Sequence, residues 1–266
     1  MALFDRRSQP TAFYAMQIMG SREEQEDSYG LCYHSPNGVD KNPTWFILAD
    51  GMGGHIGGGV ASQTVIDAVK LVMEGCNEIN EFTLREALAS ANHNISECLK
   101  INPEFKGMGT TLVVLVIFEQ KAFWVSVGDS PLLTFNDSHQ VEQLNEDHSM
   151  RPILKQLSEA GEVNGPQHMH HGRANQLRSA ITGKKIDLYD LNADGVCLKD
   201  SKYLLLSSDG LDTLSREEVQ EIMISESKKG PKVIANRLID AVLAKGSPKQ
   251  DNATLIVVDP RLIGVR

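Results

Sequence analysis

The segment from Thr111 to Phe135 restricts the fold of this chain more than any other stretch of its sequence. Apolar runs at 111–118, 122–127 and 132–135 follow one another with only short turns between them. Parallel neighbours need a crossover connection of about a dozen residues or more, so strands joined by such short links pair antiparallel. The segment therefore predicts an antiparallel sheet and argues against a parallel dinucleotide-binding sheet.

Further strands and helices are predicted on both sides of this segment. Strand-like apolar runs lie at 12–19, 45–49, 202–206 and 254–258. Apolar residues recur at helical spacing over 60–72 and 84–99, and Ser215 with Glu218 forms a capping box that predicts the start of another helix. Pro231 marks the first turn of a further helix. Helices combined with runs of antiparallel strands favour a layered α+β fold.

Length, charge and cysteine content limit the organisation and the partners of the chain. Its 266 residues, 41% of them apolar, suit a single domain over 1–266. The formal net charge is -9, and basic residues do not form long runs, so we expect no nucleic-acid partner. We expect no contact with a membrane, because no apolar stretch approaches the length of a membrane span. The 4 cysteines are scattered, without a Cys-x-x-Cys pair, which indicates a cytoplasmic protein.

Aspartates stand at the ends of several apolar runs. Asp50, Asp129 and Asp209 follow such runs, whereas Asp27 and Asp251 precede them. A strand end can hold a side chain rigidly outside the core, so these carboxylates can converge at one edge of the fold. Two carboxylates about 4 Å apart repel each other by roughly 4 kcal/mol at an effective dielectric constant near 20. The cluster must therefore take up protons or bind cations, and oxygen ligands suit Mg²⁺ or Mn²⁺ rather than Zn²⁺.

Two other kinds of site are disfavoured by the sequence. The glycine-rich segment after Asp50 follows a strand and opens a helix, but Ile56 stands where the dinucleotide fingerprint requires its third glycine. A Gly-Lys-Ser/Thr sequence, which the phosphate-binding loop of nucleotide hydrolases requires, is absent too. No cysteine or further spaced histidine completes a zinc site with His168, His170 and His171, so we interpret them as residues of an exposed loop.

A series of short motifs is spread over nearly the whole chain. In order, they are Arg22-x-x-Gln25-Glu26-Asp27, Ala49-Asp50-Gly51-Met52-Gly53-Gly54-His55, Gly107-Met108-Gly109-Thr110-Thr111-Leu112, Val127-Gly128-Asp129-Ser130, Glu146-Asp147-His148-Ser149, Ser208-Asp209-Gly210-Leu211 and Asp251-Asn252-Ala253-Thr254. One such motif is weak evidence, but their occurrence together and in this order is specific. The chain resembles the bacterial branch of the PPM (type 2C) metal-dependent serine/threonine protein phosphatases.

The resemblance implies a fold and a metal centre. The fold would be a four-layer α-β-β-α sandwich of two antiparallel β-sheets flanked by helix pairs, with two or three Mn²⁺ or Mg²⁺ ions at one edge. By position, the implied metal ligands are Asp27, Asp209 and Asp251 for one ion, Asp50 as the bridge, the Gly51 carbonyl for the second ion, Glu26 through a bound water, and Asp129 for a third, looser ion. A flap beside the site would occupy about 160–176, and its three histidines would meet the substrate.

The resemblance also implies catalytic roles. Arg22 would grip the phosphate, since a guanidinium fork suits a phosphate monoester. Asp50 and Asp209 would serve catalysis through the ions they hold. A water or hydroxide that bridges two ions would attack phosphorus, without a protein nucleophile. The leaving oxygen needs a proton, for which His55 and a metal-bound water are the candidates, and we favour the water.

The implied activity is metal-dependent hydrolysis of phosphoserine and phosphothreonine in proteins, by a monomer that counters a serine/threonine kinase. Two alternatives stay open. One is a catalytically weak regulatory or binding module with the same fold, and the other is a small-molecule phosphate monoesterase. The first would be indicated by loss of metal ligands, and all of them are present. The second could use the same centre, and only the resemblance favours a protein substrate.

The sequence departs from the usual pattern of the family at three positions. Pro131 stands where an arginine usually follows Gly-Asp-Ser, Gly59 stands in place of a glutamate, and Gln25 stands in place of an asparagine. None of these positions is an implied metal ligand. The departures therefore concern local supporting contacts, the affinity for the third metal and turnover, rather than the two-metal core.

Overall fold

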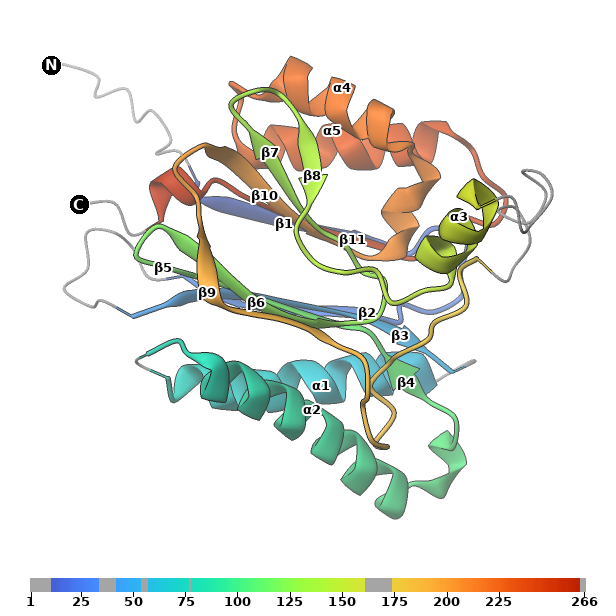
Figure 1. The fold of residues 1–266 in the computed structure, drawn as a ribbon. Coiled ribbons are helices and arrows are strands. Elements are labelled where there is room, and N and C mark those ends of the chain that lie inside the picture. The colour runs from blue at the N-terminus through green and yellow to red at the C-terminus, as the bar shows by residue number, and fades with distance from the viewer. Residues whose placement is uncertain (1–10, 34–41, 54–56, 77, 161–173, 264–266) are drawn as a thin grey trace, which may run out of the picture.

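Two β-sheets pack face to face between two layers of helices in the computed structural model (Figure 1). The structure describes residues 11–33, 42–53, 57–76, 78–160 and 174–263. Every recorded strand pair in it is antiparallel. The predicted α+β class, with two antiparallel sheets flanked by helices, is confirmed.

The two sheets have separate strand orders. The first sheet has the order β1 (Phe13–Ile18), β11 (Ala253–Val258), β10 (Ser201–Ser207), β7 (Leu132–Asn136) and β8 (Val141–Gln143). The second sheet has the order β2 (Asp27–Cys32), β3 (Thr44–Met52), β5 (Leu112–Phe118), β6 (Lys121–Val127) and β9 (Asp190–Cys197), and the short strand β4 (Gly109–Thr110) pairs with β3. The prediction of one antiparallel sheet over 111–135 is correct for the hairpin of β5 and β6 and wrong for β7, because the turn after β6 leads the chain into the other sheet.

Each sheet is covered on its outer face by a pair of helices. Figure 1 shows α1 (Gly57–Glu74) and α2 (Glu81–Ile101) beneath the second sheet, and α4 (Arg216–Glu226) and α5 (Pro231–Ala244) above the first. The predicted capping box is present at the start of α4, where Ser215 accepts a hydrogen bond from the Glu218 backbone and the Glu218 side chain accepts one from the Ser215 backbone. A shorter helix, α3 (Arg151–Glu159), follows β8 and lies at one end of the sandwich (Figure 1).

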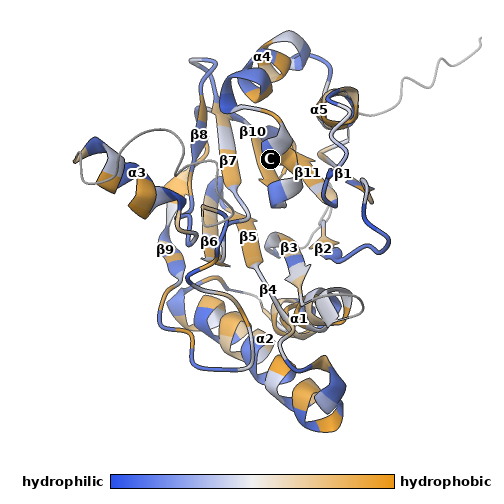
Figure 2. Cartoon of the chain, turned by 90° about the vertical axis from the view of Figure 1, so that its right-hand side faces the viewer, coloured by the Kyte–Doolittle hydropathy of each residue, from blue (hydrophilic) through white to orange (hydrophobic). Residues whose placement is uncertain are grey.

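The strands read as continuous apolar runs because both of their faces are buried. In β3, Trp45 and Ile47 pack in the core between the second sheet and the helices α1 and α2, whereas Phe46 and Leu48 pack in the core between the sheets. A third core lies between the first sheet and the helices α4 and α5. Figure 2 shows the hydrophobic colour of β5 and β7, which are buried in the same way. Alternation of apolar and polar residues is lost in a strand that belongs to two cores.

The sequence pattern did not predict every element. It missed β2, β8, β9 and α3, which are only partly buried. The strand β9 ends the second sheet and contains Asp190 and Asn192, so no apolar run marks it. In the part of the chain that the structure describes, no helix has the length and apolar character required to cross a membrane. Most of the predicted flap (160–176) falls in 161–173, outside the described residues.

Candidate metal centre

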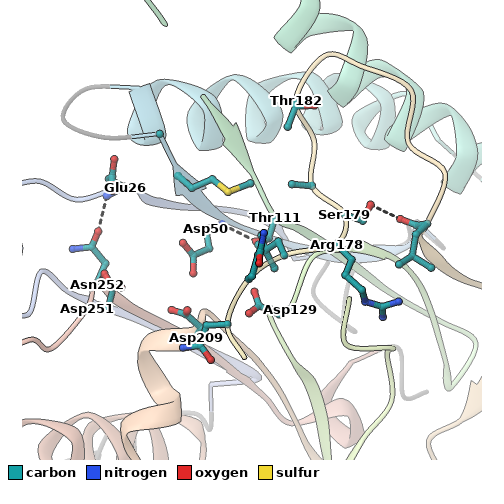
Figure 3. Close-up of a pocket in the computed structure, with 18 of the residues that line it drawn as sticks. Glu26, Asp50, Thr111, Asp129, Arg178, Ser179, Thr182, Asp209, Asp251 and Asn252 are labelled. Atoms are coloured by element: carbon teal, nitrogen blue, oxygen red, sulfur yellow. Dashed lines mark hydrogen bonds between the residues drawn. The ribbon is translucent and has the colours of Figure 1, made fainter. Parts of the chain in front are cut away.

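A cleft of about 820 Å³ opens at the edge where strands of both sheets end. The predicted site residues in its lining are Arg22, Glu26, Asp50, Gly51, Asp129, Asp209 and Asp251. They belong to β3, to the segments beside β2, β6 and β11, and to the 3₁₀ turn η3 (Asp209–Thr213) that follows β10. Figure 3 shows the carboxylates of Asp50, Asp129 and Asp209 directed toward the same space. Four of the five strand-end aspartates, Asp50, Asp129, Asp209 and Asp251, therefore line one cleft as predicted.

Asp50 is held by its backbone near the end of β3. Its N–H donates to Thr111 Oγ1 (3.0 Å), and its carbonyl oxygen accepts from Thr110 Oγ1 (2.9 Å) and from the Thr111 N–H (2.9 Å). These three bonds tie the end of β3 to the start of β5. The Asp50 side chain can therefore enter the cleft from a fixed base (Figure 3).

Gly51 and Gly58 allow the first turn of α1 to approach the cleft. A Cβ atom at Gly51 would lie 2.1 Å from the carbonyl oxygen of Gly58, and one at Gly58 would lie 2.3 Å from Oε1 of Glu26. That Oε1 atom is buried and has no hydrogen-bond partner among the described residues. The backbone N–H of Glu26 donates to Asn252 Oδ1 (2.8 Å; Figure 3). Glu26 thus carries a buried acceptor oxygen without a donor, as a carboxylate that awaits a water or a cation would.

A close backbone contact brings Asp209 and Asp251 to the same wall of the cleft. A Cβ atom at Gly210 would lie 1.9 Å from the carbonyl oxygen of Asn252, so only glycine fits between η3 and the start of β11. Gln250 Nε2 also donates to the Gly210 carbonyl (3.0 Å). Asp209 and Asp251 come from different loops, and this contact fixes the distance between their backbones.

Three carboxylates of the cleft, those of Glu26, Asp50 and Asp209, resist ionisation. Burial, together with the charges of Asp27 and Asp209, raises the pKa of Asp50 well above its ordinary value. Burial and the charges of Asp129 and Asp251 raise the pKa of Asp209 to about 7. Burial also raises the pKa of Glu26. The negative charges of these carboxylates therefore repel one another, and bound cations would reduce that repulsion.

The donor set suits divalent oxygen-binding cations. Carboxylates of Asp50, Asp209 and Asp251, the Gly51 carbonyl and the unpartnered oxygen of Glu26 are all hard ligands of the kind that Mn²⁺ and Mg²⁺ prefer. Among the described residues, no three His, Cys, Asp or Glu side chains are already arranged to hold one ion. Ligation would thus draw these carboxylates closer together.

Asp27 occupies a different position from the other predicted ligands. It pairs in register with Asp50 across β2 and β3, but it is buried and does not belong to the described lining of the cleft. Its Oδ2 atom accepts hydrogen bonds from Ser208 Oγ (2.7 Å) and Thr254 Oγ1 (2.7 Å). Asp27 thus lies behind Asp50 and connects the two sheets.

The cleft also contains cationic side chains. Arg22 Nη2 donates to Asp251 Oδ2 (2.5 Å), so the predicted phosphate-binding arginine lies beside a predicted metal ligand. Arg178, Lys184 and Lys185 line the cleft as well, and the sequence analysis did not identify them. They lie in an irregular segment between the predicted flap and β9, where neither periodicity nor a short motif marks a functional residue.

Some predicted residues cannot be placed. His55, the alternative general acid, and the flap residues His168, His170 and His171 lie outside the described residues. Asn175 and Gln176, at the C-terminal end of the predicted flap, do line the cleft. Of the three departures, Gln25 makes supporting contacts, because its Oε1 accepts from the Asp27 N–H (3.0 Å) and its Nε2 donates to the Ile18 carbonyl (3.2 Å).

The fold and the acidic cleft together define a candidate metal-dependent hydrolase. Comparisons with known proteins identify its family. Residues 25–227 match the family model described as protein phosphatase 2C. The serine/threonine phosphatase stp of Listeria monocytogenes is 31% identical over 249 residues, which cover 90% of this chain and 91% of that protein. Protein phosphatase PhpP of Streptococcus pneumoniae is 32% identical over 189 residues, 69% of this chain and 74% of that protein.

Solved structures agree with these matches. The serine/threonine phosphatase Stp1 from Staphylococcus aureus has a TM-score of 0.78 and 30% identity, over 93% of this chain and 94% of that one. The catalytic domain of the serine threonine protein phosphatase PstP, in complex with 2 manganese ions, has a TM-score of 0.71 and 28% identity, over 93% of this chain and 96% of that one. The chain belongs to the protein phosphatase 2C family, as its motifs predicted.

Proposed function

We propose that this member of the family releases phosphate from phosphoserine and phosphothreonine residues of proteins, with two divalent cations in the cleft and a third held more loosely at Asp129. The observation that carries the proposal is the convergence of Asp50, Asp209 and Asp251, from strand ends of both sheets, in one cleft. The names of its relatives, and the 2 manganese ions in the PstP complex, support the substrate class and the metal.

The cations would be held by Asp50, Gly51, Asp209 and Asp251. When bound, they would supply a hydroxide at neutral pH and offset charge on the phosphoryl oxygens. The backbone of Asp50 is held by hydrogen bonds with Thr110 and Thr111, which suits a residue that would ligate a cation from a fixed position. The unpartnered Oε1 of Glu26 would accept a hydrogen bond from a water in the cleft. We propose that the buried Asp27 supports Asp50 from behind and joins the sheets through Ser208 and Thr254.

The substrate would be a phosphoprotein modified by a serine/threonine kinase. The basic side chains of Arg178, Lys184 and Lys185 lie in the cleft with the carboxylates, so a phosphate group would meet both cations held by aspartates and cations of the chain. A regulatory module without activity is disfavoured, because the carboxylates predicted to bind metal are present together with a cleft of about 820 Å³ to receive a ligand.

The proposal is tested by phosphate release from a phosphothreonine peptide, measured in Mn²⁺, in Mg²⁺ and after exhaustive treatment with EDTA. We expect release with added metal, none after chelation, and recovery when Mn²⁺ returns. A small phosphate monoester, tested at the same concentration, separates the substrate classes. Faster hydrolysis of the monoester than of the peptide would favour a small-molecule esterase. Full activity in EDTA after removal of tightly bound ions would contradict a metal centre.

Replacement of Arg22 by alanine is expected to raise KM for the peptide about tenfold with little change in kcat, because a hydrogen bond to a charged group contributes about 1.5–3 kcal/mol. Its side chain is 52% exposed and bonds to Asp251, so it can turn toward a phosphate. Mn²⁺ affinity should be kept or increased, since the charge that balances Asp251 is lost. Steady-state kinetics with saturating Mn²⁺ provide the measurement.

Arg85 offers a matched control for Arg22. Its side chain is 51% exposed and bonds to a carboxylate, that of Glu81, but it lies on α2 and does not line the described cleft. Arg85→Ala should leave KM unchanged. If Arg22→Ala behaved like Arg85→Ala, the phosphate-binding role of Arg22 would be wrong.

A further inference from the structure

A second cavity, of about 570 Å³, lies beside the metal cleft. Its lining includes Asp147, Arg151, Asp212 and Arg216, and it shares one acidic residue with the cleft, which is Asp129. Asp129 is 6% exposed, so its carboxylate forms part of the wall between the two spaces. A group in the second cavity can therefore contact Asp129 without entering the cleft.

Arg151 lies in the second cavity and contacts Asp129 from there. Its guanidinium donates from Nη2 to Asp129 Oδ2 (3.1 Å), from Nε to Asp147 Oδ2 (3.1 Å), and from Nη1 to Asp212 Oδ2. The side chain is 28% exposed and starts from the first residue of α3. One cation thus serves three carboxylates that come from three separate loops. An arginine is always charged, so this cation is present at every pH at which the protein folds.

The contact also accounts for a departure in the sequence. Pro131 stands two residues after Asp129, where members of the family usually have an arginine. Pro131 lines the second cavity, into which the guanidinium of Arg151 reaches from α3. The cavity beside Pro131 thus contains a positive charge, which Arg151 carries. Arg151 donates to one carboxylate oxygen of Asp129, which is Oδ2.

We propose that Arg151 is the resident counter-cation of Asp129 and competes with the third metal ion for that carboxylate. The inference rests on the proposed function, in which Asp129 holds the loosest ion. Two cations that share a carboxylate repel each other. For a divalent and a monovalent ion about 6 Å apart, the repulsion even in bulk water corresponds to about a tenfold change in binding constant. The role of Arg151 is to keep the third site weak and the loop of Asp129 in place without a metal.

The test is Mn²⁺ binding by calorimetry and by electron paramagnetic resonance of the free ion, for the wild-type chain and for Arg151→Gln. We expect the weakest site of Arg151→Gln to tighten at least about tenfold, because the local charge becomes more negative by one unit. The two tighter sites should change by less than about twofold, since Arg151 contacts none of their proposed ligands. A purely structural role would weaken binding and lower the melting temperature, and it would not produce a gain in affinity.

Three further variants make the test specific. Arg151→Lys keeps the charge, so its weakest site should stay within about threefold of wild type. Arg216→Gln removes a cation that lines the same cavity but bonds to Gln143 instead of Asp129, and it should change nothing. Arg151→Gln combined with Asp129→Asn should lose the gain. If Arg151→Gln does not fold, Arg151→Met, which keeps the apolar stem, replaces it with the same expected gain.

The proposal is overturned if the weakest site of the neutral variants keeps its affinity or loses it, if Arg216→Gln produces an equal gain, or if the gain survives Asp129→Asn. If the wild-type protein shows no pair of tighter Mn²⁺ sites, the result would instead contradict the proposed function. The two failures are thus distinguishable, because they concern different sites in the same titration.

Discussion

Asp50→Asn is expected to lower kcat/KM for a phosphothreonine peptide by at least about a hundredfold, because even the residues that only support metal ligands contribute about 10- to 100-fold. The backbone of Asp50 forms hydrogen bonds with both Thr110 and Thr111. Its carboxylate lines the cleft. An amide would leave this geometry intact and remove the charge. Kinetics at saturating Mn²⁺, with circular dichroism as a check on folding, provide the measurement.

Asp27→Asn is the matched comparison for Asp50→Asn, since the two residues face each other in register. An asparagine at 27 can still accept hydrogen bonds from Ser208 and Thr254. If Asp27 supports Asp50 from behind, the variant should lose about 10- to 100-fold in activity and keep both tight metal sites. If Asp27 is itself a ligand, as its motif predicts, the variant should lose one of those sites. An Asp50→Asn protein with wild-type activity would exclude Asp50 from the metal centre.

Mn²⁺ should raise the melting temperature of the wild-type chain, and Asp209→Asn should lose most of this increase. A ligand at a hundred times its Kd adds about 2.7 kcal/mol to the free energy of unfolding, which corresponds to roughly 5–10 °C in a chain of this size. Without metal, Asp209→Asn should melt at the wild-type temperature or above it, because one negative charge is removed from a repelling cluster. Thermal melts with and without Mn²⁺ measure both effects.

Asp187 provides the control for this experiment. It lines the same cleft, but its side chain is 73% exposed and pairs with Lys185, so it should not bind the ions. Asp187→Asn should show the full increase with Mn²⁺. An equally large increase in Asp209→Asn would show that Asp209 is not a ligand.

Much of the fold could be predicted from local features of the sequence. The strands β3, β5, β6, β10 and β11 are apolar on both faces, so each stands out as a run. The short link between β5 and β6 correctly predicted an antiparallel pair, whereas the link from β6 to β7 crosses between the sheets. The helix α4 was marked by its capping box. The strands β2 and β9 escaped detection, because β2 contains Gly30 and polar residues and β9 is a partly exposed edge strand.

The site was predicted in part for the same reason. Asp50 and Asp209 stand at the ends of strands that the sequence marks clearly. Because residues at strand ends gather at the edge of a sheet, the sequence predicted that these two carboxylates lie close together. The contacts of Arg151 could not be predicted, because they join α3 to carboxylates at 129 and 212 that are distant in sequence. Such long-range pairs are determined by how the two sheets pack, and no local pattern encodes that packing. The predicted metal ligands came from the resemblance to a family, because the spacing of the aspartates along the sequence does not show which of them would bind a metal ion.

The strand order of the first sheet has a consequence for the synthesis of the protein. The strand β11 is the last in the described chain, yet it lies between β1 and β10 and pairs with both. Until the ribosome has released residues 253–258, β1 and β10 lack the strand that lies between them and pairs with both. The strand β1 can therefore pair only after β11 has been synthesised. A nascent chain that stops short of β11 can neither close its first sheet nor gather the full set of proposed metal ligands.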